Sequence, residues 1–87
     1  MTLPELRQAI DEINHSLIAH FSERLDVARK IARLKKEAGL PVLDEEREKA
    51  QMQDLRQLAA DYKLDPEVIE KIFTIYVDYS REEMKNL

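Results

Sequence analysis

No glycine or proline interrupts the chain between Pro4 and Gly39, and apolar side chains recur there at intervals of three and four residues. The apolar positions are Leu3, Leu6, Ile10, Ile13, Leu17, Val27, Ile31 and Leu34. This spacing predicts one amphipathic helix, with a capping box at Thr2 and Glu5 and an end at Gly39. At 1.5 Å per residue, a helix of about 35 residues would be roughly 50 Å long.

The length of this helix constrains the architecture, because the whole chain has only 87 residues. A compact domain of that size has a radius of gyration near 12 Å and a diameter of about 30 Å. The predicted helix is longer by many turns, and its apolar stripe continues to both ends. A second copy of the chain would have to cover the excess, so we expect an intertwined helical homodimer.

Two shorter helices are expected after the short apolar linker at residues 40–43. Asp44 is a predicted N-cap with several acids after it, and this second helix would run to about Tyr62. Asp65 and Pro66 predict the start of a third helix, which would end near the C-terminus. Together with a single glycine, three prolines and 37% charged residues, this pattern predicts an all-α fold of three helices.

The composition argues against several classes of protein. The chain has no cysteine, which excludes disulfides and thiolate metal sites and is compatible with a cytoplasmic protein. No apolar run approaches the roughly 20 residues of a membrane span, and the N-terminus has no signal-peptide pattern. His15 and His20 lie on different helix faces, and there is no glycine-rich phosphate loop. We therefore expect a single domain over residues 1–87 with no metal, no cofactor and no membrane partner.

Six cations and one acid occur between Arg24 and Lys36, although the net charge of the chain is −4. At 100° per residue, Arg24 and Lys35 lie only about 20° apart, on a strip that also carries Ala28 and Ile31. The opposite side carries Arg29, Arg33 and Lys36, which we expect to be solvated. Because the chain is acidic and no aromatic residues interleave with these bases, the sequence argues against nucleic-acid binding.

Arg24 and Lys35 are separated by about 16 Å along the helix axis. Two interpretations remain open from the spacing alone, because an unpaired cation is costly to bury. The two side chains could bind an anion between them, or they could pair with acids of other helices. Arg7 lies about 25 Å from Arg24 along the helix, so it is either an ordinary surface arginine or meets Arg24 of an antiparallel second chain.

Three further polar residues are candidates for a site. Glu48 lies one turn beyond Asp44 and could face inward, whereas N-capping already explains Asp44. Ser80 shares a helical strip with apolar residues and could simply donate a hydrogen bond to a carbonyl of its own helix. No general base accompanies it, so nucleophilic catalysis is not indicated.

Taken in order, these residues resemble the pattern of the all-helical chorismate mutase family. The pattern consists of Arg7, Arg24, Lys35, Asp44, Arg47, Glu48 and Ser80. The resemblance covers nearly the whole chain, including "LRQAIDEIN" at Leu6–Asn14, "ERLDVARKIARLKKEAGLPVLDEERE" at Glu23–Glu48 and "LDPEVIEKIFTIYVDYS" at Leu64–Ser80. It implies an intertwined dimer with two active sites built from both chains. It also implies conversion of chorismate to prephenate by a Claisen rearrangement, without cofactor, metal or covalent intermediate.

The resemblance implies a role for each residue. Arg24 and the partner's Arg7 would clamp the two carboxylates of the chorismate dianion, with Ser80 assisting at the ring carboxylate. Lys35 would contact a carboxylate and the ether oxygen, where negative charge develops as the carbon–oxygen bond breaks. Glu48 would hold the ring hydroxyl. Substrate binding would be completed by Asp44 and by the backbone near Arg47.

One position departs from the family pattern. The family usually has glutamine, or sometimes glutamate, four residues after the serine, as a second catalytic partner of the ether oxygen. Met84 occupies that position here and cannot donate a hydrogen bond. Losing a comparable donor costs roughly 10²–10³ in rate, so the sequence predicts a weak or altered mutase.

Two alternative functions remain open. One is a related pericyclic enzyme that acts on isochorismate or aminodeoxychorismate, although Asp44 and Glu48 favour a substrate with a ring hydroxyl. The other is a non-catalytic helical dimer, for which Met84 is the argument. The number of inward polar groups argues against a purely structural dimer.

Overall fold

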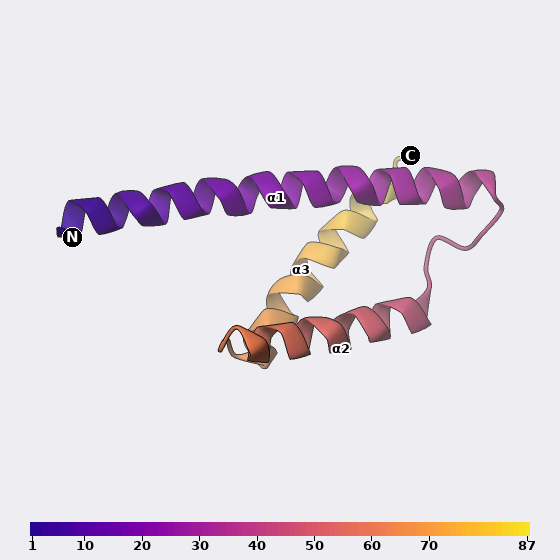
Figure 1. The fold of residues 1–87 in the computed structure, drawn as a ribbon. Helices are drawn as coiled ribbons and strands as arrows, with labels where there is room; N and C mark the ends of the chain where they lie inside the picture. The colour runs from indigo at the N-terminus through magenta and orange to yellow at the C-terminus, as the bar shows by residue number, and fades with distance from the viewer.

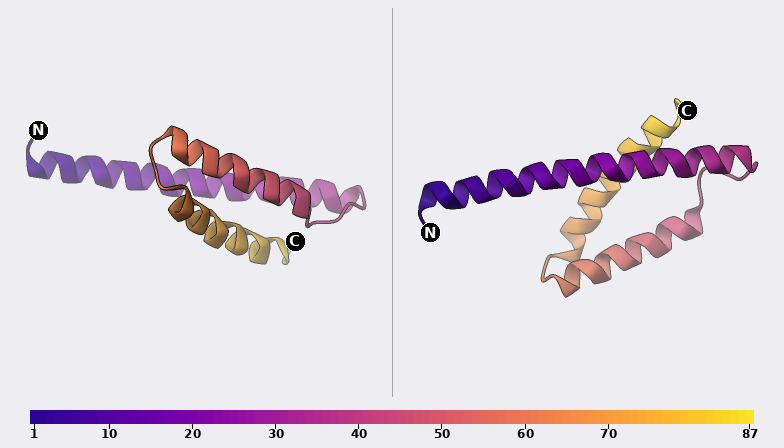
Figure 2. Two further views of the ribbon diagram at one scale, coloured as in Figure 1. Left: turned by 90° about the horizontal axis from the view of Figure 1, so that it is seen from below. Right: turned by 45° about the horizontal axis from the view of Figure 1, so that its top comes forward.

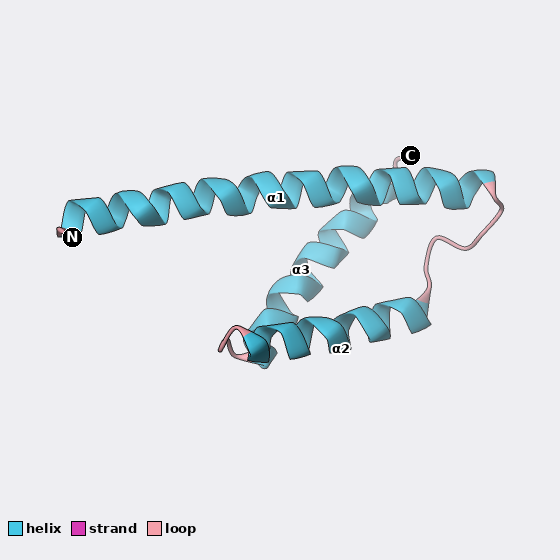
Figure 3. Ribbon diagram, in the orientation of Figure 1, coloured by secondary structure: helices cyan, strands magenta, loops and turns pink.

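The computed structural model describes all 87 residues as three helices without a strand (Figures 1 and 3). The helices are α1 (Leu3–Glu37), α2 (Glu45–Asp61) and α3 (Pro66–Met84). The predicted all-α fold of one long and two shorter helices is therefore confirmed. No helix combines the length and the apolar character needed to cross a membrane.

The helices begin where the sequence predicts caps. Before α1, the backbone amide of Glu5 donates to Thr2 Oγ1 at 3.3 Å, which is the first bond of the predicted capping box. The Glu5 carboxylate accepts from the Thr2 hydroxyl at 3.0 Å instead of from the Thr2 backbone amide. Asp44 accepts from the Arg47 amide at 3.1 Å and so caps α2. At the end of α1, Gly39 has φ 69°, a left-handed conformation that is readily available to glycine.

α2 and α3 fold back beside the C-terminal half of α1, whereas the N-terminal half of α1 projects beyond both (Figures 1 and 2). α3 packs against both α1 and α2, but α1 and α2 make no contact with each other. The chain measures 55 × 25 × 16 Å with a radius of gyration of 16.2 Å. A compact domain of this length would have a radius near 12 Å, so one chain leaves most of α1 uncovered.

Burial within one chain is sparse. Only Leu25, Ala32, Ala59 and Ser80 are buried. The projecting half of α1 exposes a continuous apolar stripe, formed by Leu3, Leu6, Ile10, Ile13 and Leu17. A few hundred Å² is the usual limit for an apolar patch on a monomeric protein, so a stripe of this extent needs a covering partner.

The contact between α1 and α3 is aromatic. The rings of Phe21 and Tyr76 lie 4.6 Å apart between centroids, and the Tyr76 hydroxyl donates to the Phe21 carbonyl. Ion pairs join α2 to α3, where Arg56 lies 2.9 Å from Glu70 and 3.6 Å from Glu67. α3 therefore sets the position of both other helices.

Candidate active site

Arg24 of α1 is half-buried and stacked against α3. Its guanidinium carbon lies 5.1 Å from the ring centroid of Tyr76 and 6.0 Å from that of Phe73. It forms no ion pair within the chain. Attraction to the aromatic rings holds the cation without using its N–H groups, and none of these donates a hydrogen bond within the chain, so they remain free to bind a carboxylate.

Lys35 lies in the last turn of α1 and is half-buried. Its Nζ donates to the Val42 carbonyl of the linker at 3.2 Å. An ammonium group has three protons, so this bond leaves two for other acceptors. Like Arg24, Lys35 has no acidic partner in the chain. Within one chain, nothing therefore supports the interpretation that Arg24 and Lys35 form ion pairs with acids of other helices.

The opposite side of α1 departs from the expectation in one respect. Arg33 and Lys36 are exposed, as predicted. Arg29 was expected to be solvated, but it lies 2.9 Å from Asp26 and 3.5 Å from Glu83 of α3. The expectation for Arg29 is wrong because the C-terminal turns of α3 cross this part of α1, which periodicity alone does not indicate.

Glu48, in the first turn of α2, is bound by a side chain of α3. Arg81 Nη2 donates to Glu48 Oε2, and Arg81 Nη1 lies 3.4 Å from Asp78 Oδ1. The hydrogen bond to Glu48 raises the pKa of the Arg81 guanidinium above its ordinary value, while partial burial opposes that shift. The two side chains also line a cavity of about 90 Å³ between α2 and α3.

Ser80 is the one buried polar residue, and its Oγ has no hydrogen-bond partner. The alternative in which this hydroxyl donates to its own helix is therefore wrong for this structure. A buried hydroxyl without a partner costs about 1–3 kcal/mol, which gives it a strong preference for an added acceptor. Within one chain, the hydrogen-bonding capacity of the Ser80 hydroxyl is therefore unused.

Within one chain, the side chains of the remaining candidate residues form no hydrogen bond or ion pair with the side chains described above. Asp44 and Arg47 are exposed at the start of α2, where Asp44 acts as the N-cap. Arg7 is exposed near the start of α1, 17 residues before Arg24 on the same helix. Within a single chain, Arg7 and Arg24 therefore do not face one ligand.

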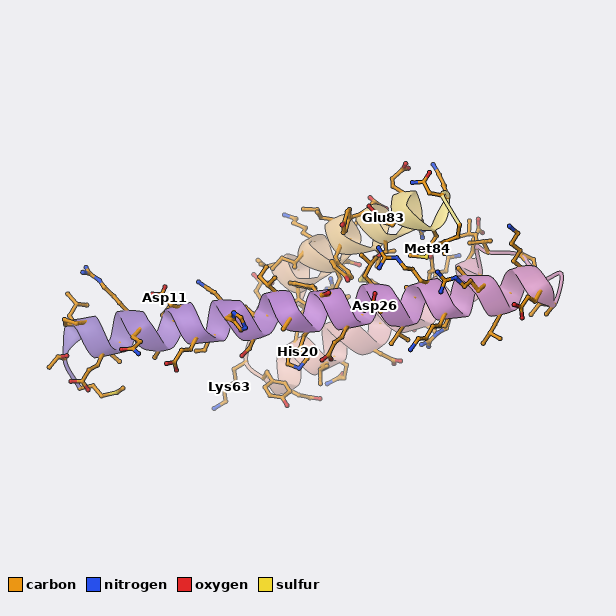
Figure 4. The ribbon with its side chains drawn as sticks, turned by 90° about the horizontal axis from the view of Figure 1, so that it is seen from above. Asp11, His20, Asp26, Lys63, Glu83 and Met84 are labelled. Carbon is orange, nitrogen blue, oxygen red and sulfur yellow. The ribbon has the colours of Figure 1, made fainter.

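Met84 is the last residue of α3 and is half-buried (Figure 4). Its two neighbours in sequence are already engaged. Glu83 lies 3.5 Å from Arg29, and Lys85 donates to Glu82 at 2.8 Å. Neither neighbour supplies the donor that methionine lacks.

Residues 6–85 match the family model of chorismate mutase type II. The chain belongs to the chorismate mutase type II family. This family consists of isomerases, so the resemblance and the prediction of an isomerase are confirmed. The matched region contains every candidate residue from Arg7 to Met84.

Three relatives are similar to this chain, and one of them is named as a chorismate mutase. The chain is 33% identical over 79 residues to a chorismate mutase of Methanocaldococcus jannaschii. The aligned residues cover 91% of this chain and 80% of that protein. The chain is 46% identical over 61 residues to a 3-dehydroquinate dehydratase of Pyrobaculum aerophilum, covering 70% of the chain and 19% of the relative. It is 33% identical over 70 residues to a T-protein of Haemophilus influenzae, covering 80% of the chain and 19% of the relative. The chain thus spans about a fifth of the latter two proteins.

Sequence reasoning missed two features of this chorismate mutase family member. It assigned no role to Arg81, although this residue directly follows Ser80 and lies near Glu48 in space. It also treated Phe73 and Tyr76 only as apolar residues of a helical strip. Arg81 lies four residues after Val77, so the two share one helix face, and both line the cavity that Glu48 also lines.

Proposed function

We propose that the protein converts chorismate to prephenate as a homodimer with two sites, each built from both chains. One observation carries the proposal. In a member of the chorismate mutase type II family, Arg24 and Lys35 are half-buried cations on one strip of α1, and neither has an acidic partner in the chain. Cations held in this way call for an anionic ligand.

The exposed apolar stripe on the projecting half of α1 supports a homodimer. An antiparallel second α1 would cover this stripe and would bring the partner's Arg7 towards Arg24. The substrate carries two carboxylates, so each site needs two cations, which Arg24 and the partner's Arg7 would supply. The protein would carry out this reaction in the cytoplasm, a location that fits its lack of cysteine.

The first task of the site is to hold a flexible dianion in the reactive chair. Arg24 and the partner's Arg7 would each bind one carboxylate, and the free hydroxyl of Ser80 would donate to the ring carboxylate. Fixing the two ends of the molecule brings the reacting carbons together. The substrate then loses its conformational entropy on binding, and this loss no longer adds to the barrier of the reaction.

The second task is to stabilise the charge that develops on the ether oxygen. Lys35 would place an ammonium proton there, where it interacts more strongly with the transition state than with the ground state. Glu48 would accept a hydrogen bond from the ring hydroxyl, with Asp44 and the backbone near Arg47 assisting. Met84 supplies no second donor, so turnover would be slow.

The proposal is tested by the loss of the ultraviolet absorbance of chorismate with purified protein, comparing the wild type with Arg24→Ala. Arg33→Ala is the matched control, because Arg33 is an exposed cation of the same helix. We expect Arg24→Ala to abolish most of the activity and Arg33→Ala to retain it. Equal rates for Arg24→Ala and the wild type would refute the catalytic assignment, and sedimentation of a monomer would refute the shared site.

Substrate profiling separates the remaining alternatives. We expect chorismate to be consumed faster than isochorismate or aminodeoxychorismate, because Glu48 and Asp44 suit a ring hydroxyl. A non-catalytic dimer would neither consume chorismate nor be stabilised by it against heat. The two measurements together distinguish a slow enzyme from an inactive binding protein.

A further inference from the structure

We propose that Arg81 is a positioning residue, which orients the Glu48 carboxylate for the ring hydroxyl of the substrate. The inference rests on the proposed function. Arg81 and Glu48 are 33 residues apart in sequence and belong to α3 and α2. Arg81 Nη2 donates to Glu48 Oε2, whereas Glu48 Oε1 has no hydrogen-bond partner in the chain.

One oxygen of the carboxylate is thus tied and the other is free. A carboxylate on a flexible three-carbon side chain loses rotational freedom when a guanidinium holds one of its oxygens. The remaining oxygen then points in a defined direction and stays available as an acceptor. This is the arrangement that recognition of a single hydroxyl donor requires.

Arg81 is itself held in place. Its Nη1 lies 3.4 Å from Asp78 Oδ1, one turn earlier on α3, so the guanidinium is anchored on its own helix before it reaches across to α2. Glu48 and Arg81 also line the same cavity, whose apolar wall is formed by Met52, Leu55 and Val77. The side chains of Glu48 and Arg81 are 35% and 42% exposed, so water screens this pair less than a fully exposed one.

Arg81 directly follows Ser80 on α3, which links the positions of two groups of the proposed site. Ser80 is buried, and Arg81, the next residue, is rotated about 100° around the helix and reaches α2. Adjacent residues of α3 would therefore serve the two ends of the substrate ring: Ser80 would donate to the ring carboxylate, and Arg81 would hold Glu48, the acceptor of the ring hydroxyl. A fixed distance between these two groups would match the fixed geometry of the substrate ring.

A purely structural ion pair is the competing explanation, and the chain contains a matched control for it. Arg56 also joins α2 to α3, lying 2.9 Å from Glu70, but it forms no hydrogen bond or ion pair with Glu48. Its side chain is 37% exposed, close to the exposure of Arg81. Removing Arg56 therefore reports what the loss of an ion pair between these helices does while Glu48 keeps its hydrogen bond to Arg81.

The experiment compares steady-state turnover of chorismate by the wild type, Arg81→Met, Arg81→Lys and Arg56→Met. We expect Arg81→Met to lower kcat/KM by roughly 10- to 100-fold, as expected when a supporting partner of an active group is lost. Arg81→Lys should recover part of this loss, because it keeps the charge but not the fork of donors. Arg56→Met should retain nearly all activity, and thermal melting should shift to a similar extent in Arg81→Met and Arg56→Met.

Two further measurements show whether Arg81 acts through Glu48. In a Glu48→Ala background, Arg81→Met should cost little more, since the group that it positions is gone. With a chorismate analogue that lacks the ring hydroxyl, Arg81→Met and the wild type should react at similar rates. An additive loss in the double variant, an equal loss with the analogue, or full activity in Arg81→Met would each overturn the proposal. A wild type that neither binds nor converts chorismate would overturn the proposed function and this inference together, which is a distinct result.

Discussion

The guanidinium of Arg24 on α1 lies over the ring of Tyr76 on α3, with 5.1 Å between the guanidinium carbon and the ring centroid. Tyr76 also donates its hydroxyl to the Phe21 carbonyl, one turn before Arg24. A single aromatic side chain therefore joins the two helices and supports the cation that would clamp the substrate. Different atoms of Tyr76 carry these two functions, so they can be separated by substitution.

Tyr76→Phe and Tyr76→Leu should differ in their effect on activity. Phenylalanine keeps the ring under Arg24 but loses the hydrogen bond to Phe21, so stability should fall by about 1 kcal/mol while turnover is retained. Leucine removes the stacking surface, and kcat/KM should fall by roughly tenfold because Arg24 is no longer preorganised. Melting curves and chorismate turnover measured below the melting transition check both effects. Equal turnover by the two variants would show that the ring does not support Arg24.

Met84→Gln should raise activity. A glutamine amide at this position would donate a hydrogen bond to the ether oxygen as charge develops there, and a donor of this kind is worth roughly 10²–10³ in rate. Lys85→Gln is the control, because it introduces the same amide about 100° away around α3. The measurement is kcat under saturating chorismate. No gain in Met84→Gln would mean that this position does not face the ether oxygen.

Ser80→Ala should leave the free protein equally stable or make it more stable. The Ser80 hydroxyl is buried without a partner, and removing such a group relieves a cost of about 1–3 kcal/mol. The same change should raise KM for chorismate, because the substrate carboxylate loses a donor. Thermal melting without ligand and steady-state kinetics provide the two readouts. A marked loss of stability would show that the hydroxyl is paired in the assembled protein.

Ile10→Glu should prevent assembly. Ile10 is 57% exposed in one chain, but it lies in the middle of the apolar stripe that we expect a second α1 to cover. A carboxylate there would be desolvated without a partner on assembly, which costs several kcal/mol. Sedimentation should show dissociation, and circular dichroism should show loss of helix. Glu12→Gln, a change at an exposed polar position of the same segment, should preserve the assembly.

Lys63→Gly should stabilise the end of α2. Lys63 has φ 61°, a left-handed conformation that costs a side-chain-bearing residue about 1–2 kcal/mol and costs glycine much less. Lys71→Gly is the control, because Lys71 is exposed inside α3, where glycine should destabilise by about 1 kcal/mol. Melting temperatures of the two variants should therefore move in opposite directions. A lower melting temperature for Lys63→Gly would contradict the assignment of strain to this residue.

The limits of the helices were predictable because each is set by residues close together in sequence. Thr2, Asp44 and Asp65 cap the amide groups of the next turn, and Gly39 accommodates the left-handed conformation after α1. The shortage of buried residues was also predictable, because it follows from the length of α1 relative to the size of the chain.

The contacts of the side chains were less predictable. Arg29 with Glu83 and Glu48 with Arg81 depend on how α3 crosses the other helices, and periodicity along one helix does not determine that crossing. The stacking of Arg24 on Tyr76 was missed for the same reason. Arg7 illustrates a further limit, since one chain does not bring it to the other candidate residues.

If Lys35 acts as proposed, its hydrogen bond to the Val42 carbonyl gives the linker a part in the chemistry. Surface connections between helices usually tolerate changes of length, because lengthening a loop adds little to the entropy of closing it. Here the linker backbone helps to fix an ammonium group that would face the bond being broken. An inserted residue at 41 or 42 would leave the helices and their caps intact yet displace that charge. Variation in this segment would therefore be selected by reaction rate and would go unnoticed in any measurement of folding.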